Sequence, residues 1–359
     1  MSQNECVIKS FKGGGSMTKE LKTLGVDLAK NIFQLHGTND EGKQVLSKRL
    51  GREQFIEFMS NCTPCLVGIE ACSGSHYWAR TLQSLGHEVK IIAPQFVKPY
   101  VMANKNDKND ARGIAEAVTR PEMKFVAVKT AAQQDVLMVH RIRELLVKQR
   151  TAQANHIRGL LNEYGIILPQ GIRQIRQLIE RLDENQAHLS SMAYALFVRL
   201  YEQFKAIDNE VGFYDQEIKA QAMNNPLCCE VMNIEGIGPM TASALVASIG
   251  DPNVFKNGRE VSAWLGLTPK QNSSGHKIRL GGISKRGDRY LRTLLIHGAR
   301  TVTRYCDNKT DTKSQWVARK KLQHGANKAA VALANKNARI IWAIMATGAC
   351  YQPELACAA

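Results

Sequence analysis

The sequence predicts an α/β domain followed by a predominantly helical region, a chain of the α/β plus α class. Up to about residue 120, short apolar runs alternate with amphipathic segments, which is typical of strands alternating with helices. Beyond residue 130, apolar residues recur at helical spacing with charged residues between them. At 359 residues the chain is long enough for two or three cores.

Gly, Pro and Asn residues divide the first region into short segments. We expect strands in 21–35, with a hairpin turn at 38–42, and again in 65–70 and 88–93. The expected helices cover 52–60, 77–85 and 107–119, the last of them stopped by Pro121.

Two long amphipathic stretches, 131–164 and 171–224, follow on either side of a Gly- and Pro-containing break. They predict an antiparallel helical hairpin or coiled coil, with a plain spacer or a dimer interface as the simpler interpretation. From residue 226 small helices alternate with Gly-rich turns, and 299–346 is expected to be helical and basic. The expected domains are 17–128, 129–224 and 225–346, between a flexible extension (1–16) and a disordered tail (347–359).

The charge of the chain predicts a polyanionic partner. Lys and Arg total 48 against 32 Asp and Glu, a net charge of +16. Residues 224–359 hold 19 of the bases and 8 of the acids, and so carry +11 of that charge. We therefore expect one region to bind phosphates while another holds the carboxylates.

Other global features point to a cytoplasmic protein, with nucleoid contact if it binds DNA. Nine Cys with no secretory leader indicate reduced thiols, and the pair Cys62 and Cys65 is not followed by a second pair at zinc spacing. No apolar run is long enough to span a membrane. Residues 1–16 end in a Gly-rich stretch before Met17, and we expect translation to start at Met17 rather than Met1.

Four carboxylates lie in unusual places. Asp27 stands inside an apolar strand, and Glu70 ends another; a charge there is costly unless it is paired or liganded. Asp107 and Asp110 are three residues apart at a helix start, so they share one face, although helix capping is an alternative role for them. Together the four acids are a candidate Mg²⁺ site, with two ions able to act on a phosphodiester.

The basic region contains two candidate nucleic-acid elements. Residues 234–239, before a helix at 240–249, resemble a helix-hairpin-helix turn in which Gly236 and Gly238 let a phosphate approach backbone N–H groups, although an ordinary turn is the simpler interpretation. A Gly-rich loop at 266–287 carries the candidate phosphate-binding residues Lys270, Lys277, Arg279, Lys285 and Arg286. A Ser in such a loop could attack phosphorus if activated, but spacing alone makes Ser274 a weak candidate.

These residues resemble the DEDD insertion-sequence transposases, the bridge-RNA-guided recombinases whose relatives are the pilin-gene DNA invertases. The resemblance runs from about residue 22 to residue 346. Its motifs are Gly25-Val26-Asp27-Leu28-Ala29-Lys30, Gly68-Ile69-Glu70-Ala71, Asn104-Lys105-Asn106-Asp107-Lys108-Asn109-Asp110-Ala111-Arg112, Ile234-Glu235-Gly236-Ile237-Gly238 and Gly266-Leu267-Thr268-Pro269. Asn-Lys-x-Asp-x-x-Asp-Ala-Arg is the most specific of them.

The resemblance implies a RuvC-like, RNase H-type N-terminal catalytic domain, a coiled-coil middle and a C-terminal transposase domain. It implies that Asp27, Glu70, Asp107 and Asp110 hold Mg²⁺, and that a Ser after Gly-Leu-Thr-Pro forms a covalent link to DNA. Ser274 is the best match, with Ser273 and Ser284 as rivals. It further implies a homo-oligomer, in which the Ser loop can serve a neighbour's acids, and an element-encoded guide RNA that selects the DNA.

Three other functions compete with a transposase. A junction-resolving nuclease would use the same acids without a covalent intermediate. A non-catalytic nucleic-acid binder is disfavoured, because four acids beside phosphate would repel it without metal. An actin-like or sugar-kinase ATPase also begins with a strand-borne Asp, but no matching Gly-rich phosphate loops follow here.

Overall fold

The computed structural model of the chain describes residues 20–102, 106–275 and 277–353. The chain divides into two compact units, with the boundary between Thr130 and Ala131. The predicted extension (1–16) and the predicted start at Met17 lie outside the described residues, as do the last six residues of the predicted tail.

A six-stranded mixed sheet forms the centre of the first unit. Its order is β3-β2-β1-β4-β5-β6, in which β1, β4 and β5 are parallel and the remaining neighbours are antiparallel. The strands are β1 (Thr23–Leu28), β2 (Ile32–Thr38), β3 (Gln44–Gly51), β4 (Leu66–Glu70), β5 (Glu88–Ile92) and β6 (Phe125–Val126).

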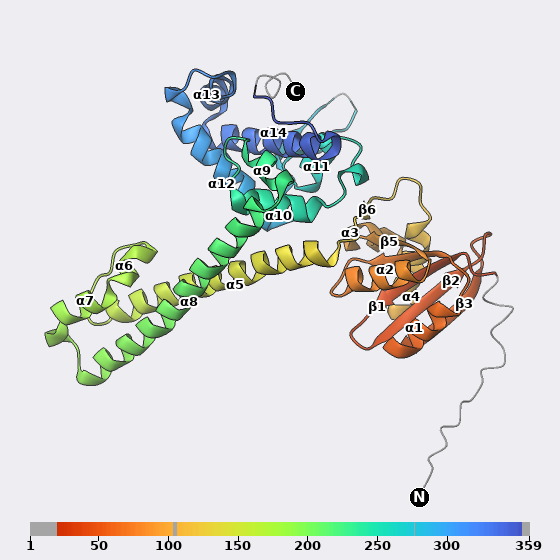
Figure 1. The fold of residues 1–359 in the computed structure, drawn as a ribbon, viewed down its shortest axis with the longest axis horizontal. Helices are drawn as coiled ribbons and strands as arrows, with labels where there is room; N and C mark the ends of the chain where they lie inside the picture. The colour runs from red at the N-terminus through yellow and green to blue at the C-terminus, as the bar shows by residue number, and fades with distance from the viewer. Residues whose placement is uncertain (1–19, 103–105, 276, 354–359) are drawn as a thin grey trace, which may run out of the picture. The chain divides into compact units, whose positions relative to one another are not determined.

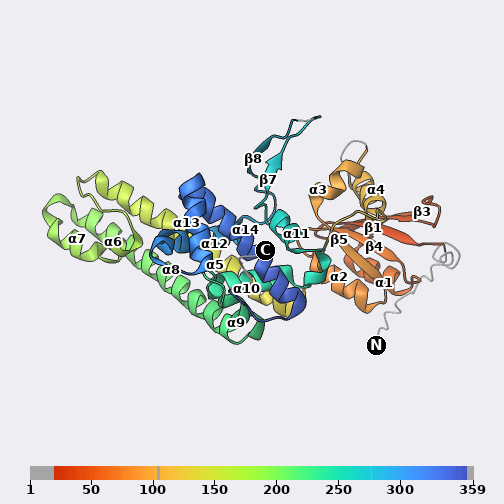
Figure 2. The same cartoon turned by 90° about the horizontal axis from the view of Figure 1, so that it is seen from above.

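Helices cover both faces of this sheet, as Figure 2 shows. They are α1 (Arg52–Ser60), α2 (Ser75–Ser84), α3 (Pro94–Val97), the 3₁₀ turn η1 (Lys98–Tyr100) and α4 (Asp107–Val118). Alternate residues of β1 and β4, such as Val26 and Ile69, point into a core shared with α1 and α2. The intervening residues face α4, so the alternation of the strands determines which side chains lie beneath that helix.

The first unit is therefore a mixed α/β fold, as predicted, and its sheet is consistent with an RNase H-like nuclease. The predicted strands and helices are present with small shifts at their ends. Strand β3 was not predicted, because it is an edge strand in which only Leu46 is buried, and so it lacks an apolar run.

Two long helices begin the second unit and lie side by side in Figure 1. They are α5 (Ala131–Asn162) and α8 (Ser191–Met223), and the ion pairs Arg143–Asp215 and Arg150–Asp208 show that they run antiparallel. The prediction that the second long helix begins at residue 171 was wrong. The short helices α6 (Ile172–Arg176) and α7 (Leu178–Glu184) and the turn η2 (Gln186–His188) precede α8.

The rest of this unit is helical around one large core. Its elements are α9 (Pro226–Met232), α10 (Pro239–Ile249), η3 (Pro252–Val254), α11 (Gly258–Trp264), the strands β7 (Pro269–Gln271) and β8 (Leu280–Ile283), α12 (Arg289–Tyr305), η4 (Cys306–Asn308), α13 (Thr312–His324) and α14 (Ala326–Thr347). The basic stretch 299–346 is thus split among three helices. Among the helices in the described ranges, none has the length and apolar character needed to cross a membrane.

Candidate active site: an acidic sheet end and a basic hairpin

Asp27 and Glu70 lie side by side at the carboxyl ends of two parallel strands. The register pairs Val26 with Ile69, so the next residues along the strands, Asp27 and Glu70, occupy adjacent positions. Both side chains are half-buried, and both interact with other residues of the chain. Cross-strand neighbours on one face are about 5 Å apart, so these two residues lie close together.

Helix α4 packs directly on the backbone of these strands. A Cβ at Gly25 would lie 2.2 Å from the carbonyl oxygen of Ala111 and 2.5 Å from the amide nitrogen of Ala115. A Cβ at Gly68 would lie 2.9 Å from Val118 Cβ. Only glycine allows this approach. Asp27 and Glu70 stand two residues beyond these glycines, and therefore on the face that α4 covers.

The amino end of α4 lies at the same end of the sheet as Asp27 and Glu70. The helix runs opposite to β1, because Thr119 lines a cavity with Thr23, while Ala111 lies over Gly25. Asp107 precedes Ala111 by four residues and Asp110 precedes Ile114 by four, so each continues a row that contacts the sheet. The structure thus places all four predicted acids at one end of the sheet.

Capping does not explain Asp107. The N-cap of α4 is Asn106, whose side chain accepts a hydrogen bond from the amide of Asn109 at 2.8 Å. The capping alternative for Asp107 was therefore wrong, and its exposed carboxylate stands in the first turn. Both carboxylates also lie where the positive end of the helix dipole stabilises negative charge. Asn104 and Lys105 of the same motif lie outside the described residues.

The electrostatics of Cys72 support the proximity of the strand carboxylates. Burial raises the pKa of the Cys72 thiol, and the negative charges of Glu70 and Asp27 raise it further. Within the described ranges, no three Asp, Glu, His or Cys side chains are gathered closely enough to hold a metal ion. The donor chemistry nevertheless fits Mg²⁺, which prefers oxygen ligands, keeps several waters and needs only one or two carboxylates together with substrate phosphates.

Ser274 lies near the tip of a β-hairpin that extends from the helices of the second unit (Figure 2). Strands β7 and β8 form its stem, and the backbones of Ser274 and Lys277 exchange hydrogen bonds of 3.4 and 3.1 Å near the tip. The Ser274 side chain is exposed. Gly275 follows with φ +56°, a left-handed conformation that turns the chain.

The surroundings of the two rival serines differ from those of Ser274. The Ser273 hydroxyl accepts hydrogen bonds from Gln271 Nε2 at 3.0 Å and from the Arg279 amide at 3.3 Å. Ser284 is half-buried at the hairpin base, where its amide donates to the Thr268 carbonyl. Ser274 is therefore the serine whose hydroxyl is best presented to a ligand.

The hairpin base is held tightly against the helices. A Cβ at Gly266 would lie 2.0 Å from the Arg286 carbonyl oxygen, and one at Gly287 would lie 1.9 Å from that of Trp264. Buried Arg292 donates to the carbonyls of Leu265 (3.0 Å) and Arg286 (3.4 Å). The sequence carries no signal that Arg292 holds the hairpin base, because its carbonyl partners are up to 27 residues away in the chain. These contacts fix the base from which Ser274 extends.

The cations predicted to bind phosphate surround this hairpin. All five are exposed: Lys270, Lys277, Arg279, Lys285 and Arg286. Lys285 has φ +55°, the one left-handed non-glycine residue within the described ranges. Such strain persists where surrounding contacts impose it, here next to the close Gly266–Arg286 packing.

The two glycines of the predicted helix-hairpin-helix turn differ in their surroundings. Gly236 has φ +85° and packs against α12, where a Cβ on Gly298 would lie 1.8 Å from the Gly236 carbonyl oxygen. Packing therefore accounts for Gly236. Gly238 is exposed, has open space around its Cα, and is the N-cap of α10.

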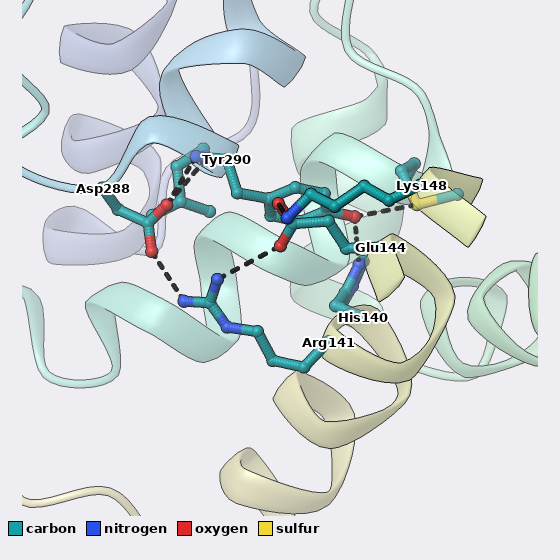
Figure 3. A network of polar contacts seen from close by, with 8 residues as sticks. His140, Arg141, Glu144, Lys148, Asp288 and Tyr290 are labelled. Atoms are coloured by element: carbon teal, nitrogen blue, oxygen red, sulfur yellow. Dashed lines mark hydrogen bonds and ion pairs between the residues drawn. The ribbon is translucent and has the colours of Figure 1, made fainter. Parts of the chain in front are cut away.

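A polar network around buried His140 joins α5 to α10 and α12 (Figure 3). His140 Nδ1 lies 2.9 Å from the Tyr290 hydroxyl, and His140 Nε2 lies 3.0 Å from Ser243 Oγ. Arg141 donates to Asp288 at 2.9 Å, and Asp288 caps α12. Burial, followed by the positive charges of Arg143 and Arg141, lowers the pKa of His140 to about 4. The sequence gave no signal for this network, because its members are about 100 to 150 residues apart.

The Cys62–Cys65 pair is a packing feature of the first unit. Burial raises the pKa of Cys62 to about 11 and that of Cys65 to about 12, so both thiols are protonated at neutral pH. Buried His87 accepts from the Cys65 amide at 3.3 Å, and its other ring nitrogen lies 3.1 Å from the Met59 carbonyl oxygen. Protonated, buried thiols are poor nucleophiles.

Two family models match this chain. Residues 24–166, which include all four acids, match the model for DEDD transposases of IS110 elements, described as "Transposase". Residues 228–315, which include the hairpin, match "Transposase IS116/IS110/IS902 family". The sheet, its acidic end and these matches define a transposase, an enzyme that binds, cuts and rejoins DNA.

Relatives of similar length extend the match over almost the whole chain. A "Probable family 20 transposase" of Pseudomonas aeruginosa is 46% identical over 335 residues, 93% of this chain and 99% of the relative. The "Transposase for insertion sequence element IS1111A" of Coxiella burnetii is 44% identical, over 94% of this chain and 93% of the relative. The "Transposase for insertion sequence element IS1328" of Yersinia enterocolitica is 38% identical, over 90% of this chain and 97% of the relative. The chain belongs to the IS116/IS110/IS902 family of transposases.

Proposed function

We propose that this transposase excises and inserts its own insertion sequence, using Mg²⁺ held by Asp27, Glu70, Asp107 and Asp110 and the hydroxyl of Ser274 as nucleophile. The observation that carries the proposal is the placement of four carboxylates, from two strands and one helix, at one end of the sheet. Four acids beside a phosphodiester are repulsive without a cation. The first unit is accordingly assigned an RNase H-like, RuvC-like nuclease fold.

The carboxylates bind the cofactor and position the scissile phosphate. Asp27 and Glu70 supply neighbouring oxygen donors from the strands, and Asp107 and Asp110 add donors from the first turn of α4. Bound Mg²⁺, as two ions, would stabilise the charge on the attacking and leaving oxygens. The half-buried setting of three of the four acids strengthens this electrostatic stabilisation relative to water.

Ser274 provides a covalent route that conserves bond energy. Its Oγ forms a bond to phosphorus as the bond from phosphorus to a sugar oxygen breaks, and the proton lost by the serine is balanced by the proton gained by that sugar hydroxyl. The reverse attack by another sugar hydroxyl releases Ser274 and rejoins DNA. One phosphodiester is exchanged for another, so no external energy source is needed.

The second unit contains most of the residues proposed to bind nucleic acid. The five exposed cations of the hairpin neutralise phosphates on either side of the attacked bond. Gly238, exposed at the start of α10, is the residue of the helix-hairpin-helix-like turn through which backbone N–H groups reach a phosphate. We propose further that an element-encoded structured RNA selects donor and target DNA, and that the active species is a homo-oligomer in the bacterial cytoplasm.

Two variants test the proposal. Asp110→Asn and Ser274→Ala should each lower recombination of a plasmid-borne element by about 10³-fold or more, as expected when a metal ligand or a nucleophile is lost. DNA affinity, measured by fluorescence anisotropy, should change little. Ser273→Ala is the matched control, because its hydroxyl is already hydrogen-bonded within the hairpin. It should retain most of the activity.

The same variants separate a recombinase from a junction-resolving nuclease. With Asp110 intact, denaturing gels should show DNA covalently attached to the parent protein and to Ser273→Ala, but not to Ser274→Ala. Hydrolytic nicks of undiminished yield from Ser274→Ala would instead establish the nuclease. Full activity of Asp110→Asn would remove the acidic site from the mechanism altogether.

A further inference from the structure

Next to the acidic residues, the row of side chains on this face of the sheet ends in an exposed arginine on the edge strand. The register aligns Asp27 with Gln34 on β2, and Gln34 with Arg49 on the edge strand β3. One row across the sheet therefore reads Arg49, Gln34, Asp27 and Glu70. Arg49 is exposed, and it has no ion-pair partner among residues that the structure describes. Its neighbour Lys48 points to the opposite face, where Nζ lies 5.0 Å from the Phe58 ring centroid.

The adjacent row contains a buried histidine without a partner. His36 pairs with Gly25, two residues before Asp27, and is only 5% exposed. Its Nδ1 is buried and has no hydrogen-bond partner in the described part of the chain. A buried polar atom left in this state costs free energy unless a ligand or water satisfies it. Burial lowers the pKa of His36, as do the charges of Arg112 and Lys108.

His36 lines a polar cavity of about 430 Å³ between the β1–β2 end of the sheet and α4. The carboxylates at its rim are already paired: Asp40 with Lys22, Glu41 with Lys43, and Glu116 with Arg120. Arg112 also lines the cavity, is exposed, and has no ion pair with any described residue. The uncompensated charge of the cavity is therefore positive, which favours an anion.

We infer that Arg112, His36 and Arg49 form a binding site for backbone phosphates of a nucleic-acid strand, on the same face of the sheet as the acids. His36 lies diagonally across from Asp27 on the neighbouring strand, and such diagonal neighbours are about 7–8 Å apart, a distance comparable to one step between successive phosphates. A phosphate there would accept from the histidine ring and from the guanidinium of Arg112. The inference rests on the proposed function in one respect only: it assumes that the acids hold the phosphate that is cut.

The site would orient the strand with respect to the acids. Arg49 lies on the edge strand in the row of Asp27, and Arg112 lies on α4 and lines the cavity together with His36. A strand following them crosses β3 and β2 before it reaches Asp27. This arrangement fixes the direction from which the scissile phosphate enters, a role separate from that of the hairpin cations of the second unit.

The test measures nucleic-acid binding by the full-length protein in EDTA, so that metal chemistry does not contribute. Fluorescein-labelled single strands of one sequence, as DNA and as RNA, are titrated over a range of salt concentrations. For Arg49→Ala/Arg112→Ala, the slope of log affinity against log salt should flatten by about 1.4, or about 0.7 for each phosphate of a single strand that is no longer neutralised. Lys48→Ala, on the opposite face, is the matched control and should keep the parent slope.

A flattened slope with DNA only, with RNA only or with both supports the site and identifies which strand occupies it. An unchanged slope of the double variant with both strands overturns the inference, as does an equal change in Lys48→Ala. Arg112→Lys, which keeps the charge, should restore about half of the lost slope when combined with Arg49→Ala, and thereby excludes misfolding as the cause. Failure here leaves the tests of Asp110 and Ser274 unaffected, because they measure strand cleavage rather than salt dependence.

Discussion

At the residue scale, two glycines determine how closely the acids approach one another. Gly25 and Gly68 have neighbours of α4 where their Cβ atoms would stand, and at Gly25 those neighbours are backbone atoms. Backbone cannot move aside as the end of a side chain can. The packing of α4 on the sheet, and with it the position of Asp107 and Asp110, therefore depends on the absence of a side chain at these two positions.

Replacing Gly25 with alanine should displace α4. Because the added methyl would overlap the backbone of Ala111 and Ala115, the free energy of unfolding of the first unit should fall by roughly 1–3 kcal/mol. Recombination should fall further than stability alone explains, since two acids move with the helix. Differential scanning calorimetry and the plasmid assay measure these effects.

The control for this substitution is Gly159→Ala, within α5, where nothing lies within 4 Å of the new methyl. That change should stabilise the protein by about 0.5–1 kcal/mol, because alanine is the better helix former. A Gly25→Ala protein that melts at the parent temperature and recombines normally would contradict the close packing.

The acids were predictable from the sequence because a charge inside an apolar strand is anomalous wherever it occurs. Asp27 and Glu70 each carry that local signal. Gly25 and His36 carry none, because their significance depends on α4, which is about 80 residues away in the chain and lies directly against them in the fold. The choice among Ser273, Ser274 and Ser284 likewise required the hydrogen bonds of the hairpin.

At the scale of elements, the start of α8 shows where periodicity misleads. The apolar spacing of Ile172, Ile175, Leu178 and Leu182 continues smoothly into the long helix, and all four pack in one core with it. The chain nevertheless turns at residues 186–188, and the side chain of Ser190 caps a new helix by accepting from the Ala193 amide at 3.1 Å. Periodicity reports which residues face a core, and capping determines where a helix begins.

The junction of α5, α10 and α12 should make the second unit sensitive to acid. In the unfolded chain His140 takes up a proton as the pH falls below its ordinary pKa of 6.5. In the folded protein its pKa is about 4, so it takes up the proton only at a lower pH. The unfolded state thus binds more protons between these values, and stability falls as the pH falls from 6.5 to 4. The loss should amount to about 3 kcal/mol.

Urea unfolding followed by Trp fluorescence measures this effect, since three of the four Trp lie in the second unit. His140→Gln should remove this part of the pH dependence, because glutamine does not titrate, although its lost hydrogen bonds lower stability at every pH. His297→Gln, an exposed position on α12, should keep the parent dependence. Identical pH dependence in the parent and in His140→Gln would show that the network does not hold a neutral histidine.

At the scale of the whole molecule, the two proposed halves of the chemistry belong to different compact units. The four acids lie in the first unit, and Ser274 with its five neighbouring cations lies in the second. The excess of basic residues in 224–359 matches this proposed division, in which the second unit carries the hairpin cations and the first unit the acids that would hold metal. Acids and serine could therefore come from one chain or from two partners in an oligomer.

Mixing two inactive variants distinguishes these arrangements. If Ser274 attacks DNA held by a partner's acids, an oligomer of Asp110→Asn with Ser274→Ala contains sites in which both groups are intact. The serine of such a site belongs to the Asp110→Asn chain, so covalently attached DNA should appear on that chain alone. Chains of different tagged length resolve the two on a denaturing gel.

Each variant alone should give no adduct. Asp110→Asn mixed with the double variant Asp110→Asn/Ser274→Ala should also give none, because that mixture has no intact set of acids. If the first mixture gives no adduct while wild-type protein does, the serine and the acids of one chain act together, and the expectation that the Ser loop serves a neighbour's acids is wrong. Adduct on the Asp110→Asn chain would establish that a complete site requires two copies of the protein.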